Sequence, residues 1–127
     1  MIRGIYNKIT GQCGEDAAVE FLKKKKYKII ERNYKNRIGE IDIIAKTKTD
    51  LVFIEVKTRS SDKFGTPAEA VTYYKKQKIV NTAKYYLLKN PTELNISFDV
   101  VEVYGKFDGL VFVCENINHF PYVFQEV

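Results

Sequence analysis

Two apolar runs joined by a short polar segment constrain the fold of this 127-residue chain more than any other feature. The runs are EIDIIAK, residues 40–46, and LVFIEVKT, residues 51–58, and the segment between them is TKTD. Short runs rich in β-branched and aromatic residues predict strands, and a short polar connection between two of them predicts a hairpin. We therefore expect an antiparallel pair of strands over these residues.

Both runs carry charged residues inside a stretch that otherwise looks like core. If the loop is Thr47 to Asp50, Asp42 faces Glu55 and Glu40 faces Lys57, and all four side chains share one face. Directly opposed side chains lie about 4.5–5.5 Å apart at Cβ, so two facing carboxylates repel unless a proton or a cation lies between them. A hard divalent cation such as Mg²⁺ suits paired carboxylates.

The same pattern supports a second interpretation, in which the sheet is half exposed and its outer face is polar. Glu40 and Lys57 would then form a cross-strand ion pair, and Asp42 would be solvated. A loop one residue longer or shorter would also remove the facing of Asp42 and Glu55. The pattern alone leaves both interpretations open.

The remaining segments predict a mixed α/β fold. Thr10 is a candidate N-cap for a first helix that ends near Lys25, and residues 27–33 predict a strand. TPAE, residues 66–69, matches a capping box that opens a second helix ending near Lys89. Residues 96–104 and 110–116 predict two further strands. The order α-β-β-β-α-β-β predicts a central mixed sheet of about five strands, in which the second helix crosses over to a parallel strand.

Composition limits the class of protein and of partner. The chain has 21 Lys and Arg against 16 Asp and Glu, which gives a net charge of +5 and favours a polyanionic partner such as nucleic acid. The run Lys23–Lys26 is interpreted as a solvated helix end. No apolar run is long enough to cross a bilayer and no signal peptide is visible, so we expect one cytoplasmic domain over residues 1–127.

Several stretches together resemble a known family. An acid on one strand followed by Glu-x-Lys on the next resembles the motif of the restriction-endonuclease-like, or PD-(D/E)xK, nucleases. The chain as a whole resembles the YraN family of small bacterial predicted endonucleases, which are similar to archaeal Holliday junction resolvases. The matching stretches lie between residues 14 and 103 and are GEDAAVEFL, ERN, GEIDIIA, FIEVKTR, GTPAEAV, KKQKIVNTAKYYL and FDVVEV.

The resemblance implies a sheet flanked by two helices and a metal-dependent nuclease site. Asp42 and Glu55 would bind Mg²⁺, for which Mn²⁺ can substitute, and Lys57 would complete the catalytic set. Glu15 matches an acid that adds a metal contact in resolvase-like members, although an ordinary acid in a first helix explains it equally well. The implied substrate is DNA, including branched DNA, and the implied assembly is a homodimer.

This sequence departs from the pattern at two positions. Ile41 stands where the superfamily has Pro, and Ser97 stands where relatives often carry Arg. If that Arg contacts phosphate, DNA binding is weaker here.

DNA binding also requires cations beside the site. The candidates are Arg32, Arg37, Arg59, Lys75 and Lys78, each of which is equally explained as a solvated surface charge. His119 and Asp99 are expected to be structural. Two other functions remain open, a nucleic-acid-binding module that keeps the nuclease fold without hydrolysis, and an interaction protein.

Overall fold

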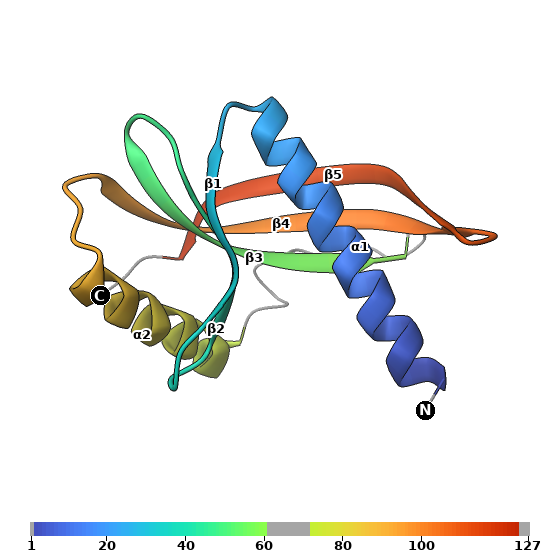
Figure 1. The fold of residues 1–127 in the computed structure, drawn as a ribbon, viewed down its shortest axis with the longest axis horizontal. Helices are drawn as coiled ribbons and strands as arrows, with labels where there is room; N and C mark the ends of the chain where they lie inside the picture. The colour runs from blue at the N-terminus through green and yellow to red at the C-terminus, as the bar shows by residue number, and fades with distance from the viewer. Residues whose placement is uncertain (1, 61–71, 125–127) are drawn as a thin grey trace.

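A computed structural model describes residues 2–60 and 72–124 of the chain (Figure 1). Its elements are α1 (Ile2–Lys24), β1 (Lys28–Lys35), β2 (Glu40–Lys46), β3 (Asp50–Arg59), α2 (Tyr73–Lys89), β4 (Asn95–Asp108) and β5 (Val111–Phe124). The strands form one sheet in the order β1-β2-β3-β4-β5. Only the β3–β4 pair, which α2 connects, is parallel. This confirms the predicted mixed α/β fold and its element order.

The β2–β3 hairpin has the predicted loop. Lys46 pairs with Leu51 and Ile43 with Ile54, so the register is the one that a four-residue loop dictates. The ladder ends at Ile43, and the predicted pairing of Glu40 with Lys57 is therefore wrong. Glu40 instead pairs with a residue of β1 and is exposed. Beyond the ladder, the backbone N–H of Val56 donates to the side-chain carboxylate of Asp42 instead of to a backbone carbonyl.

Both helices begin elsewhere than the sequence predicts. The first starts at Ile2, and Thr10 lies within it, where its hydroxyl donates to the carbonyl of Tyr6 (2.8 Å) rather than capping the helix. The second starts at Tyr73, where Thr72 is the N-cap and accepts from the backbone N–H of Lys75 (3.2 Å). The predicted capping box at residues 66–69 lies outside the described residues.

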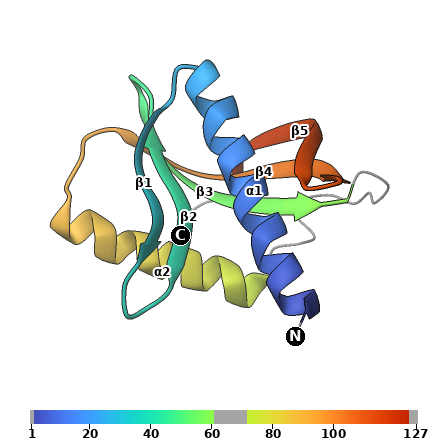
Figure 2. The same ribbon diagram turned by 45° about the vertical axis from the view of Figure 1, so that its right-hand side comes forward.

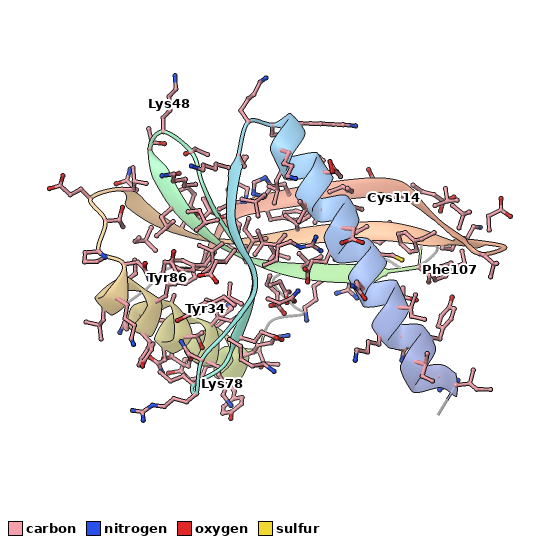
Figure 3. The ribbon with its side chains drawn as sticks, in the orientation of Figure 1. Tyr34, Lys48, Lys78, Tyr86, Phe107 and Cys114 are labelled. Carbon is pink, nitrogen blue, oxygen red and sulfur yellow. The ribbon has the colours of Figure 1, made fainter. Side chains whose placement is uncertain are left out.

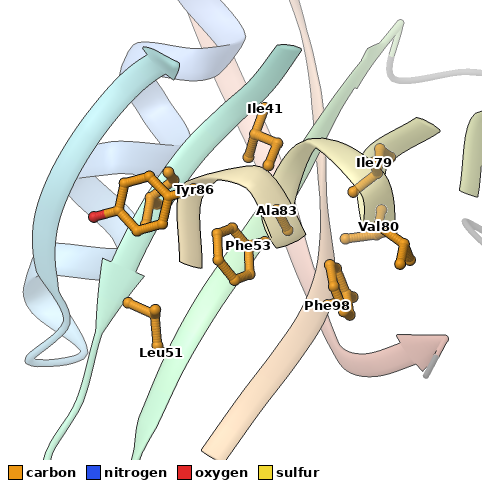
Figure 4. Packing of buried hydrophobic residues seen from close by; sticks show 10 residues of the cluster. Ile41, Leu51, Phe53, Ile79, Val80, Ala83, Tyr86 and Phe98 are labelled. Atoms are coloured by element: carbon orange, nitrogen blue, oxygen red, sulfur yellow. The ribbon is translucent and has the colours of Figure 1, made fainter. Parts of the chain in front are cut away.

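The helices cover opposite faces of the sheet (Figures 1 and 2). Under α2, Phe53 and Phe98 stack at 5.5 Å, and Tyr86 packs edge-on against Phe53 (Figure 4). Under α1, Ala18 and Leu22 pack on the other face in a second apolar cluster that includes strand residues of β2, β3 and β4. Two separate cores thus hold the sheet rigid between the helices. Neither helix in the described part of the chain combines the length and hydrophobicity that a membrane span requires.

Candidate functional site

The close approach of α1 to β3 creates the candidate site. A Cβ atom on Gly14 would lie 1.9 Å from Oγ1 of Thr58, so the helix can approach the strand this closely only because residue 14 is glycine. The next residue, Glu15, is buried against the sheet. A cavity of about 350 Å³ lies beside this contact and is lined by Asn7, Thr10, Gly11, Glu15, Asp42, Val56, Lys57 and Thr58.

Asp42 is the most perturbed acid of the cavity. Its Oδ2 accepts the backbone N–H of Val56 at 2.8 Å. Burial raises the pKa of its carboxyl to about 7, and the adjacent Glu55 and then Glu15 add to the increase through their negative charges. The Val56 hydrogen bond opposes the shift but is too weak to cancel it. The carboxyl of Asp42 therefore lies close to those of Glu55 and Glu15, and its closeness to Glu55 is what the predicted facing of the two residues implies.

Glu55 has cations as neighbours. Its Oε2 lies 3.4 Å from Nζ of Lys57 and 2.5 Å from Nζ of Lys75, which reaches it from α2. Burial, followed by the nearby ammonium of Lys75, lowers the pKa of Lys57. Burial is the largest single influence on Lys75 and acts in the same direction, but its hydrogen bonds to Glu55 and Lys57 and the charges of Glu55 and Asp42 together outweigh it and raise the pKa of Lys75. Glu55 is thus paired with two lysines, of which Lys57 has a lowered pKa and Lys75 a raised one.

An ion pair at Glu55 is what an ordinary polar surface would also show, so Glu55 alone does not identify a metal site. Asp42 separates the two interpretations. A solvated surface aspartate would have a low pKa, whereas Asp42 has a pKa raised to about 7, lies beside Glu55 and shares a cavity with Glu15. The arrangement needs a proton or a cation to relieve it.

The donor set fits a hard divalent cation in part. Asp42 and Glu55 offer oxygen ligands of the kind that Mg²⁺ binds through one or two carboxylates with the remaining positions taken by water. No cluster of three or more His, Cys, Asp or Glu side chains with metal-binding geometry occurs in residues 2–60 and 72–124. Oε1 of Glu15 accepts hydrogen bonds from Arg32 and Asn33, both at 3.0 Å, so this atom is already bound.

The five candidate DNA-binding cations fall into two groups, three that form ion pairs with carboxylates and two that are exposed. Arg32 binds Glu15 and Asp16, Arg59 binds the buried Glu102 at 2.8 Å, and Lys75 binds Glu55. Arg37 and Lys78 are exposed, and Nζ of Lys78 lies 5.5 Å from the ring centroid of Tyr74. Figure 3 shows Lys78 on α2 near the β1–β2 connection. Sequence reasoning did not anticipate these ion pairs, because their acidic partners come from elements that only the fold brings together.

Asp99, His119 and Ser97 form a separate buried cluster. The carboxylate of Asp99 accepts the hydroxyl of Ser97 and the backbone N–H of Tyr122 (3.1 Å) and lies 2.7 Å from Nε2 of His119. Ser97 is 2% exposed, so its side chain faces the interior and has no access to a phosphate. These contacts place Asp99 and His119 in the structural role that the sequence suggests.

Comparison with known proteins relates the chain to an uncharacterised group. The model of "Uncharacterised protein family UPF0102" matches residues 14–103. A UPF0102 protein of Clostridioides difficile (strain 630) is 52% identical over 101 residues, which cover 77% of this chain and 87% of that protein. One from Caldanaerobacter subterraneus subsp. tengcongensis is 44% identical over 119 residues, covering 93% and 96%. One from Clostridium acetobutylicum is 52% identical over 98 residues, covering 76% and 80%.

Proposed function

Because the chain belongs to the uncharacterised protein family UPF0102, the YraN family of the restriction-endonuclease-like superfamily, we propose that it is a metal-dependent nuclease that hydrolyses DNA phosphodiester bonds. One observation carries the proposal. Asp42 has a pKa raised to about 7 because it is buried beside Glu55, and it lines a cavity of about 350 Å³ together with Lys57, whose Nζ lies 3.4 Å from Oε2 of Glu55.

The proposed metal ligands are Asp42 and Glu55, with Mg²⁺ as the natural ion and Mn²⁺ as a substitute. A divalent cation bound there supplies an activated water at neutral pH and neutralises charge on the phosphate. The hydrogen bond from Val56 N–H fixes Oδ2 of Asp42, and the carboxyl of Asp42 also lies within hydrogen-bond reach of Glu55, where the proposed metal ion takes the place of a shared proton. Glu15 adds negative charge at the back of the site and stands as the proposed third metal contact.

Lys57 is the proposed catalytic cation. It lies two residues from Glu55 on β3, and burial lowers its pKa. An ammonium with a lowered pKa can position a water or stabilise charge at phosphorus and exchange a proton more readily than a solvated lysine. Exposed Arg37 and Lys78 are the proposed contacts to the DNA backbone, with Arg32, Arg59 and Lys75 available where DNA displaces their carboxylate partners.

A second function has one observation in its favour. The 2.5 Å ion pair between Lys75 and Glu55 leaves Glu55 satisfied without a metal. A nucleic-acid-binding module that keeps the fold but does not hydrolyse DNA would be stable in this arrangement. Such a protein would bind DNA equally well in EDTA and in Mg²⁺.

The decisive experiment is a cleavage assay with purified protein. Linear, nicked, single-stranded and four-way-junction DNA are each incubated with Mg²⁺, Mn²⁺ or EDTA. Wild type is compared with Glu55→Ala and Lys57→Ala, and with the exposed-site controls Glu93→Ala and Lys106→Ala. We expect metal-dependent cleavage that the two site variants lose by a factor of at least about 100 and the controls retain.

The remaining outcomes are equally informative. Equal cleavage by wild type and site variants would indicate a contaminating nuclease and remove the proposal. DNA binding without cleavage under any metal condition would identify the binding module. The junction arm decides whether branched DNA is the preferred substrate.

A further inference from the structure

Seven lysines gather at one end of the molecule, away from Asp42 and Glu55. We call this surface the lysine end. It consists of Lys23, Lys24, Lys25 and Lys26 at the end of α1, Lys28 at the start of β1, and Lys46 and Lys48 at the β2–β3 turn. The C-terminal end of α1 and the β2–β3 turn lie at the same end of the molecule in two views, and Lys48 projects outward there (Figures 1–3). All but the half-buried Lys46 are exposed.

The lysine end holds seven of the 21 Lys and Arg of the chain. Without these seven charges, the formal net charge of +5 becomes −2. In the part of the chain that the structure describes, none of the seven forms a salt bridge with a carboxylate. The nearest acids in the sequence are Glu20, Glu31 and Asp50, and Asp50 already accepts the hydroxyl of Tyr122 at 2.7 Å. The positive charge is therefore concentrated, and no carboxylate in the described residues forms an ion pair with it.

Two of these lysines face each other across the β1–β2 ladder. Lys28 pairs directly with Lys46, so both side chains project from the same face of neighbouring strands. Like charges in directly opposed positions destabilise an antiparallel pair. A sheet selected for stability alone would favour an acid or a neutral residue at one of the two positions.

A third lysine occupies a backbone position that favours glycine. Lys26 has φ +74° at the end of α1, where the N–H of Tyr27 donates to the carbonyl of Leu22 and that of Lys26 to Lys23, both at 3.0 Å. These bonds define a helix end whose left-handed residue is most often glycine. The helix dipole accounts for Lys23 and Lys24 in the last turn, but it does not account for Lys28, Lys46 or Lys48.

We propose that the lysine end is a second contact surface for the phosphate backbone of nucleic acid, separate from the carboxylate site. Residues that weaken a strand pair or a helix end without improving the packing are expected at functional surfaces. A dense array of exposed ammonium groups fits a ligand with regularly spaced negative charges. Lys23 and Lys24 lie eight and nine residues beyond Glu15 on the same helix, or about 12–14 Å along its axis. A DNA strand carries one phosphate per ~3.4 Å of axis, so about four phosphates separate the two regions.

Binding at the lysine end does not depend on hydrolysis, so it is measured in EDTA. The test uses fluorescence anisotropy of a labelled duplex and a labelled single strand, titrated with protein at a series of salt concentrations. The variant Lys28→Gln/Lys48→Gln removes two exposed charges of the lysine end. Its matched control, Lys89→Gln/Lys106→Gln, removes two exposed charges elsewhere and gives the same net charge.

We expect the lysine-end variant to lose about tenfold or more in DNA affinity near 0.1 M salt. The slope of log affinity against log salt should fall in magnitude by about 2, since each lost phosphate contact contributes ~0.9. The control variant should change neither quantity appreciably. Unfolding curves of both variants check that the fold is retained.

Two results would overturn the proposal. Equal loss of affinity in the variant and its control would show that only total charge matters. Full DNA affinity in the variant, together with lost binding to phosphatidylserine vesicles, would assign the lysine end to a membrane surface instead. Absence of DNA cleavage would leave this test unaffected, so the two proposals fail independently.

Discussion

Asp42 and Asp99 are two aspartates withdrawn from water in the same sheet, and their surroundings differ in kind. Asp99 has donors around it, namely the hydroxyl of Ser97, the backbone N–H of Tyr122 and the ring of His119. Asp42 has one backbone donor and faces the carboxylates of Glu55 and Glu15. Burial is therefore not what marks a functional acid in this fold. What distinguishes Asp42 from Asp99 is that its neighbours include two other carboxylates, which raise its pKa.

The largest expected effect concerns the donor-rich acid. Asp99→Ala leaves a buried imidazole, hydroxyl and backbone N–H without their acceptor, so the free energy of unfolding should fall by about 3–5 kcal/mol. Urea denaturation measures this value. The exposed Asp108→Ala on the same strand should change it by less than about 0.5 kcal/mol. Similar losses in both variants would break the contrast between the two aspartates.

Replacing Asp42, in contrast to Asp99, should raise the free energy of unfolding. The pKa of Asp42 is about 7 in the folded protein and ~3.9 in the unfolded chain, so folding binds a proton between these values and wild-type stability falls as pH rises from 4 to 7. Asp42→Asn removes this cost and keeps an acceptor for Val56 N–H. We expect the variant to be more stable than wild type by up to about 4 kcal/mol at pH 8, and equally stable below pH 4.

Unfolding curves at pH 4, 6 and 8 without metal give the comparison. Asp108→Asn is the control and should show no such trend. A loss of stability in Asp42→Asn at pH 8 would show that the carboxylate of Asp42 is stabilising and would contradict the crowding.

The crowding also depends on how closely α1 approaches β3. A Cβ on Gly14 would meet Oγ1 of Thr58 at 1.9 Å and its Cβ at 2.8 Å, so Gly14→Ala must push the helix and Glu15 away from the sheet. We expect a loss of about 1–2 kcal/mol in thermal or urea unfolding. Gly11→Ala, three residues earlier in the helix and with open space around it, should instead gain up to about 1 kcal/mol. Equal behaviour of the two variants would show that the contact is not tight.

The smallest expected effect sharpens the role of Lys75. Its ammonium holds Glu55 at 2.5 Å, so a metal ion must displace it. Lys75→Ala should therefore tighten Mn²⁺ binding by about tenfold in calorimetric titration, whereas Lys78→Ala should leave it unchanged. Unfolding free energy should change by less than about 1 kcal/mol, because the Lys75 side chain is 43% exposed. Weaker Mn²⁺ binding in Lys75→Ala would mean that this lysine supports the metal site.

The sequence predicts local structure better than contacts between distant elements. The ladder of residues 43–46 with 51–54 follows from alternation and loop length, so the hairpin register and the proximity of Asp42 to Glu55 just beyond it are predictable, whereas the end of the ladder before Glu40 and Lys57 is not. The start of α1 is not, because Thr10 resembles a cap yet bonds back within the helix. The partners of Arg32, Arg59 and Lys75 are not predictable either, because they depend on how α1 and α2 pack against the sheet and on the pairing of β4 with β3. The run Lys23–Lys26 looks like a solvated helix end in the sequence, and only the fold brings it to the same end of the molecule as the facing pair Lys28 and Lys46.

The central claim is that Asp42 and Glu55 together bind a divalent cation, and calorimetric titration of Mn²⁺ at pH 7 tests it most directly. The account predicts saturable binding by wild type, with protons released because Asp42 must ionise, and loss of that binding in Glu55→Gln. Binding that is absent in wild type, or unchanged in Glu55→Gln, would contradict the account.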